Sequence, residues 1–65
     1  MSENTASLGE VGSAYLTARG WALGVDDWRI RRRVKRLEQR KKRGLLDAPG
    51  QARLNALNDV RAARS

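Results

Sequence analysis

The stretch that most constrains how this chain folds runs from Arg29 to Arg43 and reads RIRRRVKRLEQRKKR. Its apolar side chains are Ile30, Val34 and Leu37, which follow one another at spacings of four and three residues. These spacings match the 3.6-residue turn of an α-helix and exclude a β-strand, in which every second side chain shares a face. On a helix the three side chains form a stripe roughly 60° wide. The stretch is therefore predicted to be a helix with one narrow apolar face.

The same stretch holds most of the positive charge. Ten of its fifteen residues are Lys or Arg and only Glu38 is acidic, so it carries +9, whereas the rest of the chain carries −2. Like charges at i,i+4, such as Arg32 and Arg36, destabilise an isolated helix by roughly 0.2–0.5 kcal/mol per pair. A charge run is often only a solvated face, but small soluble domains usually mix both signs there. A polyanion lying along the helix would relieve the repulsion.

The proportion of Arg to Lys in this stretch indicates which kind of polyanion it would bind. Seven of the ten basic residues are Arg and three are Lys. The planar guanidinium binds phosphate with two parallel hydrogen bonds and can also bind guanine edges, whereas the Lys ammonium acts as a point charge. Neutralising phosphates releases condensed counterions, which gives affinity without sequence specificity. We therefore expect a small nucleic-acid-binding protein, and the sequence does not choose between DNA and RNA.

The whole chain, 1–65, is predicted to form one small all-α domain of three helices, with residues 1–6 as a disordered tail. The helices are expected at about residues 8–19, 27–43 and 49–63, with the basic one central in the chain and the longest. The first helix could also run on to Leu23. The short connection between the second and third helices favours an antiparallel C-terminal hairpin.

Residues that start and end helices set these boundaries. Ser7 and Glu10 match a capping box, in which each side chain accepts a hydrogen bond from the other's backbone amide. Pro49 suits a first helical turn. A carboxylate is expected to cap the start of each later helix, Asp26 or Asp27 for the second and Asp47 for the third. A glycine is expected to stop each earlier helix, Gly20 for the first and Gly44 for the second.

The first and third helices each have a predicted apolar face. In the first helix this face repeats at three and four residues and consists of Leu8, Val11, Tyr15, Ala18 and Ala22. In the third helix it consists of small residues widened to one side by leucines, namely Ala52, Ala56, Val60 and Ala63 with Leu54 and Leu57. Both faces are expected to pack into the core.

Composition excludes several classes of protein. The chain has no Cys and no His, which removes disulfides, the commonest metal ligands, the thiol nucleophile and the usual general base. No acid, Ser, Thr or Lys has an evident catalytic partner. We expect no enzyme, no metal site and no cofactor. No apolar run approaches the length of a membrane span, and residues 1–6 do not form a signal peptide, so a cytoplasmic protein is expected.

The predicted nucleic-acid site consists of basic residues of the second helix and one aromatic side chain. These are Trp28, Arg29, Arg31, Arg32, Lys35, Arg36, Arg40, Lys42 and Arg43. On a helical wheel Trp28 lies about 160° from Ile30, on the basic side. Its indole either folds back into the core or stacks on an unpaired base. Trp21 is expected to be a core residue or a plug between helices. Arg53 lies outside the Arg29–Arg43 run and is expected to have little effect on binding.

The segment from Leu16 to Lys35 resembles the helix-turn-helix of bacterial DNA-binding regulators. In that pattern Gly20 is the small residue where the two helices cross, Leu23-Gly24-Val25 forms the turn, and Ile30 is buried. The basic run also resembles the arginine-rich helices that bind structured RNA. These resemblances imply a DNA-binding regulator or an RNA-binding protein. The sequence departs from the helix-turn-helix pattern at Arg19 and Arg33, which stand at apolar positions, at Val34, which is one place out of register, and at Asp26 and Asp27, whose carboxylates would face DNA.

An interaction protein is the alternative function. The stripe of Ile30, Val34 and Leu37 would then complete a bundle with a second copy or with a helical partner, as in a phage or particle component. An anionic membrane surface is disfavoured, because three apolar residues are few for insertion. The oligomeric state stays open.

Overall fold

A computed structural model describes residues 8–65, and that part of the chain contains three helices and no strand. The helices are α1 (Leu8–Leu23), α2 (Asp27–Lys42) and α3 (Ala48–Arg64). The prediction of an all-α, three-helix domain is therefore confirmed. The predicted tail at residues 1–6 and the cap at Ser7 lie outside the described residues.

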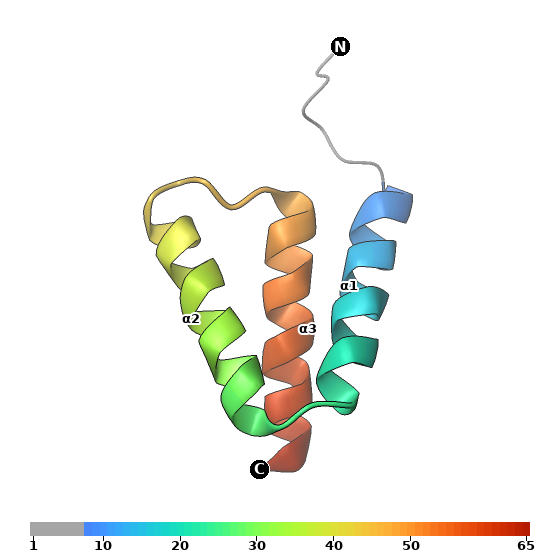
Figure 1. Cartoon of the computed structure of the whole chain (residues 1–65). Coiled ribbons are helices and arrows are strands. Elements are labelled where there is room, and N and C mark those ends of the chain that lie inside the picture. The colour runs from blue at the N-terminus through green and yellow to red at the C-terminus, as the bar shows by residue number, and fades with distance from the viewer. Residues whose placement is uncertain (1–7) are drawn as a thin grey trace.

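The three helices are arranged around α3. Figure 1 shows α3 between the other two helices, with α2 running antiparallel to both. α3 packs against α1 and α2, whereas α1 and α2, which follow one another in the chain, scarcely touch. The basic helix α2 is thus central in the sequence but lies at the side of the bundle. With 16 residues it is not the longest, because α3 has 17.

The first helix ends at Leu23, which is the longer of the two extents that the sequence left open. Gly20 lies inside α1 instead of stopping it, because the following turn carries Trp21 and Ala22, which pack against the core. Ala22 is fully buried, and its burial requires the helix to extend that far. At the other end Leu8 is 92% exposed, so the predicted apolar face begins only at half-buried Val11.

The second helix ends where the sequence predicted. Gly44 has φ +72°, the left-handed conformation that glycine adopts at little cost. The amide of Leu45 donates to the carbonyl of Arg40 at 2.9 Å, and the amide of Gly44 donates to the carbonyl of Lys41 at 3.0 Å. These two bonds form a Schellman motif, which satisfies carbonyls at the end of the helix.

The three carboxylates named as candidate helix starts behave differently. Asp47 is the N-cap of α3, and its Oδ1 accepts a hydrogen bond from the Gly50 amide at 2.8 Å, as predicted. Asp26 occupies the N-cap position of α2, but its side chain accepts no capping bond. Asp27 is the first residue of α2, and its carboxylate pairs with arginine side chains described below.

The core lies between α2 and α3. Ile30 and Val34 of α2 pack with Leu54, Leu57 and Val60 of α3, and Ile30 and Leu57 are fully buried. Ala22 of α1 joins this cluster, and half-buried Leu37 packs against it. Burial of the leucine side of α3 by α2 therefore accounts for the apolar stripe that the sequence predicted.

The small-residue side of α3 faces α1. Ala52 and Ala56 are buried there, and on the same side Asp59 accepts a hydrogen bond from the Tyr15 hydroxyl of α1. Small side chains let two helices approach closely, which explains the extensive contact between α1 and α3. Ala63 is exposed, so its predicted place in this face is wrong.

Candidate nucleic-acid interface

The cations of α2 divide into two flanks on either side of its buried face. One flank carries Arg and no acid within about 100° of the helix circumference, namely Arg29, Arg32, Arg33, Arg36, Arg40 and Arg43. The opposite flank carries Arg31, Lys35 and Lys42 together with Asp27 and Glu38. The two flanks therefore differ in net charge as well as in the type of cation.

The arginine flank borders a depression that also reaches α1. Its lining residues are Trp21, Trp28, Arg29, Arg32, Arg33 and Arg36, and its volume is about 310 Å³. A second depression, of about 300 Å³, is lined by Arg33, Arg36, Leu37, Arg40 and Arg53. Because Arg33 and Arg36 border both depressions, the two adjoin along α2. We call them together the arginine groove.

The arginine groove is uniformly cationic. Six arginines line it, five from α2 and Arg53 from α3, and none of its lining residues in the described part of the chain is acidic. Within residues 8–65, Arg31 is the only cation of the Arg29–Arg43 run that has a carboxylate oxygen within 4.0 Å, and Arg31 lies outside the groove. An anion entering the groove therefore meets guanidinium groups that no carboxylate of residues 8–65 pairs with.

Two tryptophans border one end of the groove. Trp28 is 47% exposed, so the interpretation of its indole as a core residue is wrong. The guanidinium carbons of Arg29 and Arg32 lie 5.3 Å and 5.9 Å from the centre of its ring. Trp21 is half-buried against the core, as predicted, and Arg33 of α2 lies 4.6 Å from the centre of its ring. This last cation–π contact is one of the few links between α1 and α2.

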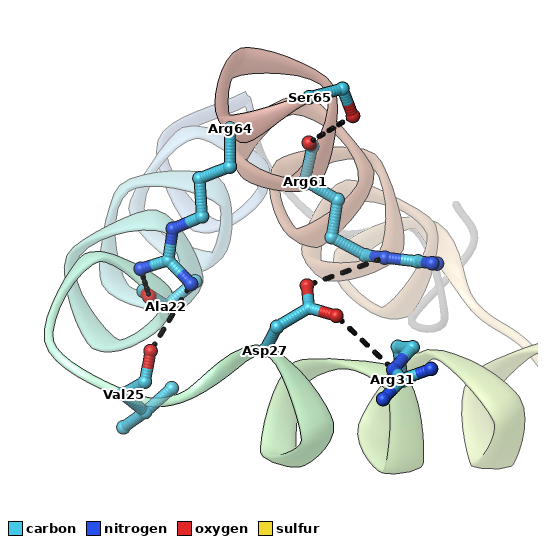
Figure 2. Close-up of polar contacts among 7 residues, drawn as sticks. All are labelled: Ala22, Val25, Asp27, Arg31, Arg61, Arg64 and Ser65. Carbon is cyan, nitrogen blue, oxygen red and sulfur yellow. Dashed lines mark hydrogen bonds and ion pairs between the residues drawn. The ribbon is translucent and has the colours of Figure 1, made fainter.

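A polar cluster joins the ends of the helices away from the groove (Figure 2). The Arg64 guanidinium donates to the carbonyl of Ala22 at 2.8 Å and to that of Val25 at 3.2 Å, which ties the turn after α1 to the end of α3. Asp27 lies 3.1 Å from Arg31 and 3.8 Å from Arg61. The Asp27 carboxylate is thus directed toward α3 and Arg31, and it offsets the charge of Arg31.

The structure therefore separates the predicted site residues into two groups. Trp28, Arg29, Arg32, Arg36 and Arg40 line the arginine groove. The others lie elsewhere on the exposed surface: Arg31 beside Asp27, Lys35 and Lys42 in a depression that also contains Glu38, and Arg43 at the C-cap of α2.

Four residues that line the groove were not part of the predicted nucleic-acid site, namely Trp21, Arg33, Leu37 and Arg53, and of these Leu37 had been assigned to the partner stripe. The helical wheel could have indicated Arg33, because it falls on the same flank as Arg29 and Arg36. The sequence had no signal for Arg53, which reaches the groove from another helix. Arg53 was also expected to have little effect on binding, and its position beside Arg36 and Arg40 argues against that expectation.

The predicted partner stripe is covered by the same chain. Ile30 and Val34 are buried against α3, and Leu37 is half-buried. A second copy or another helical protein could contact Ile30 and Val34 only if α2 separated from α3. The structure thus provides an internal partner for the residues that the sequence left without one.

The residues that carry the helix-turn-helix resemblance occupy the end of α1, the turn and the start of α2. Leu23 ends α1, and Ile30 is buried as that pattern requires. Gly20 is exposed, and a Cβ placed on it would meet nothing within 4 Å. The expectation that Gly20 lies at a close helix crossing is therefore wrong.

Comparison of the chain with protein-family models, with curated proteins and with solved structures gave no match. Within residues 8–65 no helix has the length and apolar character needed to cross a membrane. The same residues contain no cluster of His, Cys, Asp or Glu side chains suited to hold a metal ion.

Proposed function

We propose that this protein binds nucleic acid, and that the arginine groove contacts the phosphate backbone. One observation carries the proposal: six arginines from two helices line two adjoining depressions, in which no lining residue of the described part of the chain is acidic. A solvated surface gains nothing from such a one-sided arrangement, because the like charges repel one another. Phosphate groups bound along the groove would turn this repulsion into attraction.

The dimensions of α2 suit several consecutive phosphates. Arg29 and Arg40 border opposite ends of the groove, and at 1.5 Å per residue they are separated by about 16 Å along the helix axis. Successive phosphates of a duplex strand rise by about 3.4 Å along the axis but also wind around it, so the number of contacts is set by the arginines available, five of which lie on α2. Guanidinium groups can bind such phosphates bidentately, and each neutralised phosphate releases condensed counterion.

The test is a salt titration of binding, followed by fluorescence anisotropy of labelled duplex DNA, single-stranded DNA and structured RNA. Five phosphate contacts predict that the logarithm of the association constant for duplex DNA falls with the logarithm of salt concentration, with a slope of roughly −4 to −5. Replacing Arg36, which borders both depressions, by Ala should weaken binding to all sequences alike and reduce the slope by about one.

Arg19→Ala is the matched control, because it removes the same charge from α1 at a residue that does not line the groove. Arg53→Ala, on α3, should behave like Arg36→Ala and not like Arg19→Ala. Equal effects of Arg36→Ala and Arg19→Ala would mean that net charge alone attracts the ligand, and the groove would have no special role. Tight binding to anionic lipid vesicles with none to any nucleic acid at low salt would replace the proposal by a membrane-surface function.

A further inference from the structure

We propose that the ligand of the groove is single-stranded, and that one unpaired base stacks on the Trp28 indole. This inference rests on the proposed function, because the arginines must first hold the strand. It adds a chemical class of ligand to that function: a strand whose bases are free of a duplex.

The position of Trp28 argues for a role in binding. It lies about 160° around α2 from buried Ile30, and it is not one of the buried or half-buried residues that form the core cluster. Tryptophan is a costly residue to leave half in water, since its ring has a large apolar surface. At 47% exposure, Trp28 offers part of this surface to a ligand, at a place where every other α2 residue lining the depression is Arg.

The surrounding arginines can hold a nucleotide against the ring. Arg29 and Arg32 lie within 6 Å of the centre of the Trp28 ring, so a phosphate bound by either would lie within one nucleotide of the indole. Guanidinium planes also stack on bases, so these side chains can flank a base that contacts the ring. The depression continues to Trp21, whose ring is paired with Arg33.

A duplex cannot use this contact in the same way. Within a duplex both faces of each base are covered by neighbouring bases, and a base must leave the stack before an indole can cover it. Duplex binding would therefore depend on the phosphates alone, whereas a single strand would gain base stacking as well. Trp28 should accordingly matter for single strands and not for duplexes.

The experiment measures affinities by anisotropy for three labelled ligands at one salt concentration: an oligothymidine, an abasic strand with the same number of phosphates, and a duplex. The variants are Trp28→Ala and Trp28→Phe. Trp28→Ala should weaken binding to oligothymidine at least about fivefold. It should change binding to the abasic strand and to the duplex by less than about twofold, because those ligands present phosphates without an available base. Trp28→Phe, which keeps an aromatic face, should retain most of the affinity for oligothymidine.

A second readout uses the Trp21→Phe variant, in which Trp28 is the only tryptophan. Oligothymidine should quench its fluorescence and shift its emission, and the abasic strand should do so much less. Equal quenching by both ligands would overturn the stacking proposal, because the signal would then come from the bound backbone.

The failures are distinguishable. Equal losses of affinity for oligothymidine and for the abasic strand in Trp28→Ala would overturn stacking and leave phosphate binding in place. Loss of the helical circular dichroism signal in Trp28→Ala would assign the indole to the fold, and it would also overturn the proposal. No binding of the parent protein to any of the three ligands at low salt would instead refute the proposed function itself.

Discussion

Replacing Gly50 by Ala should destabilise the protein, although Ala is the better helix former. Gly50 is the third residue of α3 and is buried. A Cβ on this residue would lie 2.6 Å from Leu46 Cδ1 and 2.9 Å from Asp47 Oδ1, both shorter than any normal contact. Leu46 packs against the core cluster and Asp47 is the N-cap that accepts the Gly50 amide, so relieving either clash disturbs an interaction of the folded state.

The expected loss of stability in Gly50→Ala is the balance of one favourable and two unfavourable contributions to the free energy of unfolding. Ala gains up to about 1 kcal/mol over Gly in a helix interior, and less in the first turn. Displacing Leu46 resembles overpacking a core, which costs about 1–3 kcal/mol. Displacing the Asp47 carboxylate weakens a cap worth about 1 kcal/mol. The net destabilisation of Gly50→Ala should therefore be about 1–3 kcal/mol.

Gly20→Ala is the matched control, because a Cβ at Gly20 would meet nothing within 4 Å and the residue lies within α1. It should stabilise the protein by up to about 1 kcal/mol through helix propensity alone. Both variants can be compared by urea and thermal unfolding followed at 222 nm. For a domain of this size 1 kcal/mol corresponds to a shift of about 4–8 °C in Tm. A Gly50→Ala protein as stable as the Gly20→Ala protein would refute the close packing described at the start of α3.

Two further predictions concern α2 and α1. Val34→Ala should lower the free energy of unfolding by about 2 kcal/mol or more, because Val34 is 4% exposed in the core. Leu37→Ala should lower it by less, because Leu37 is half-buried. Urea unfolding of both variants measures these losses, and a loss below about 0.5 kcal/mol for Val34→Ala would contradict the burial of Val34. The pKa of Tyr15 is raised above its usual value, chiefly because the hydroxyl donates a hydrogen bond to Asp59. Burial and the negative charge of Asp59 raise this pKa further, and the positive charge of Arg19 partly offsets the increase. Since the folded pKa exceeds the unfolded value of about 10, this stabilisation is complete below about pH 10 and is lost as pH rises through the folded pKa. Urea midpoints of the parent and Tyr15→Phe should therefore converge at alkaline pH, and a constant difference would contradict the bond.

The sequence predicted a helix boundary well where interactions within a few neighbouring residues determine it. The left-handed Gly44 and the Asp47 cap act within a few residues, so their effect can be read from the sequence. Gly20 was named as a stop, but α1 passes through it. The weak helix propensity of one glycine is outweighed by the burial of Ala22 in the next turn.

The candidate site was only partly predictable for a different reason. The helical wheel separates the arginine flank of α2 from the flank that carries Lys, but it does not say which flank borders another helix. Which flank borders another helix depends on how α1 and α3 pack. The same packing decides that Arg53 and Trp21 line the groove. Trp28 and Trp21 have the same chemistry, and only the tertiary fold decides that one is exposed while the other packs against the core.

The placement of α3 between the other helices has a consequence for the order of folding. Packing of α1 on α3 closes a loop that contains the whole of α2, and the entropy cost of that closure grows only slowly with the length of the loop. The apolar core lies between α2 and α3, which a short connection joins, so we expect this hairpin to form first and α1 to dock on it last and to detach first. A polyanion bound at the depression that joins Trp21 of α1 to the arginines of α2 would favour the docked α1 and slow its release.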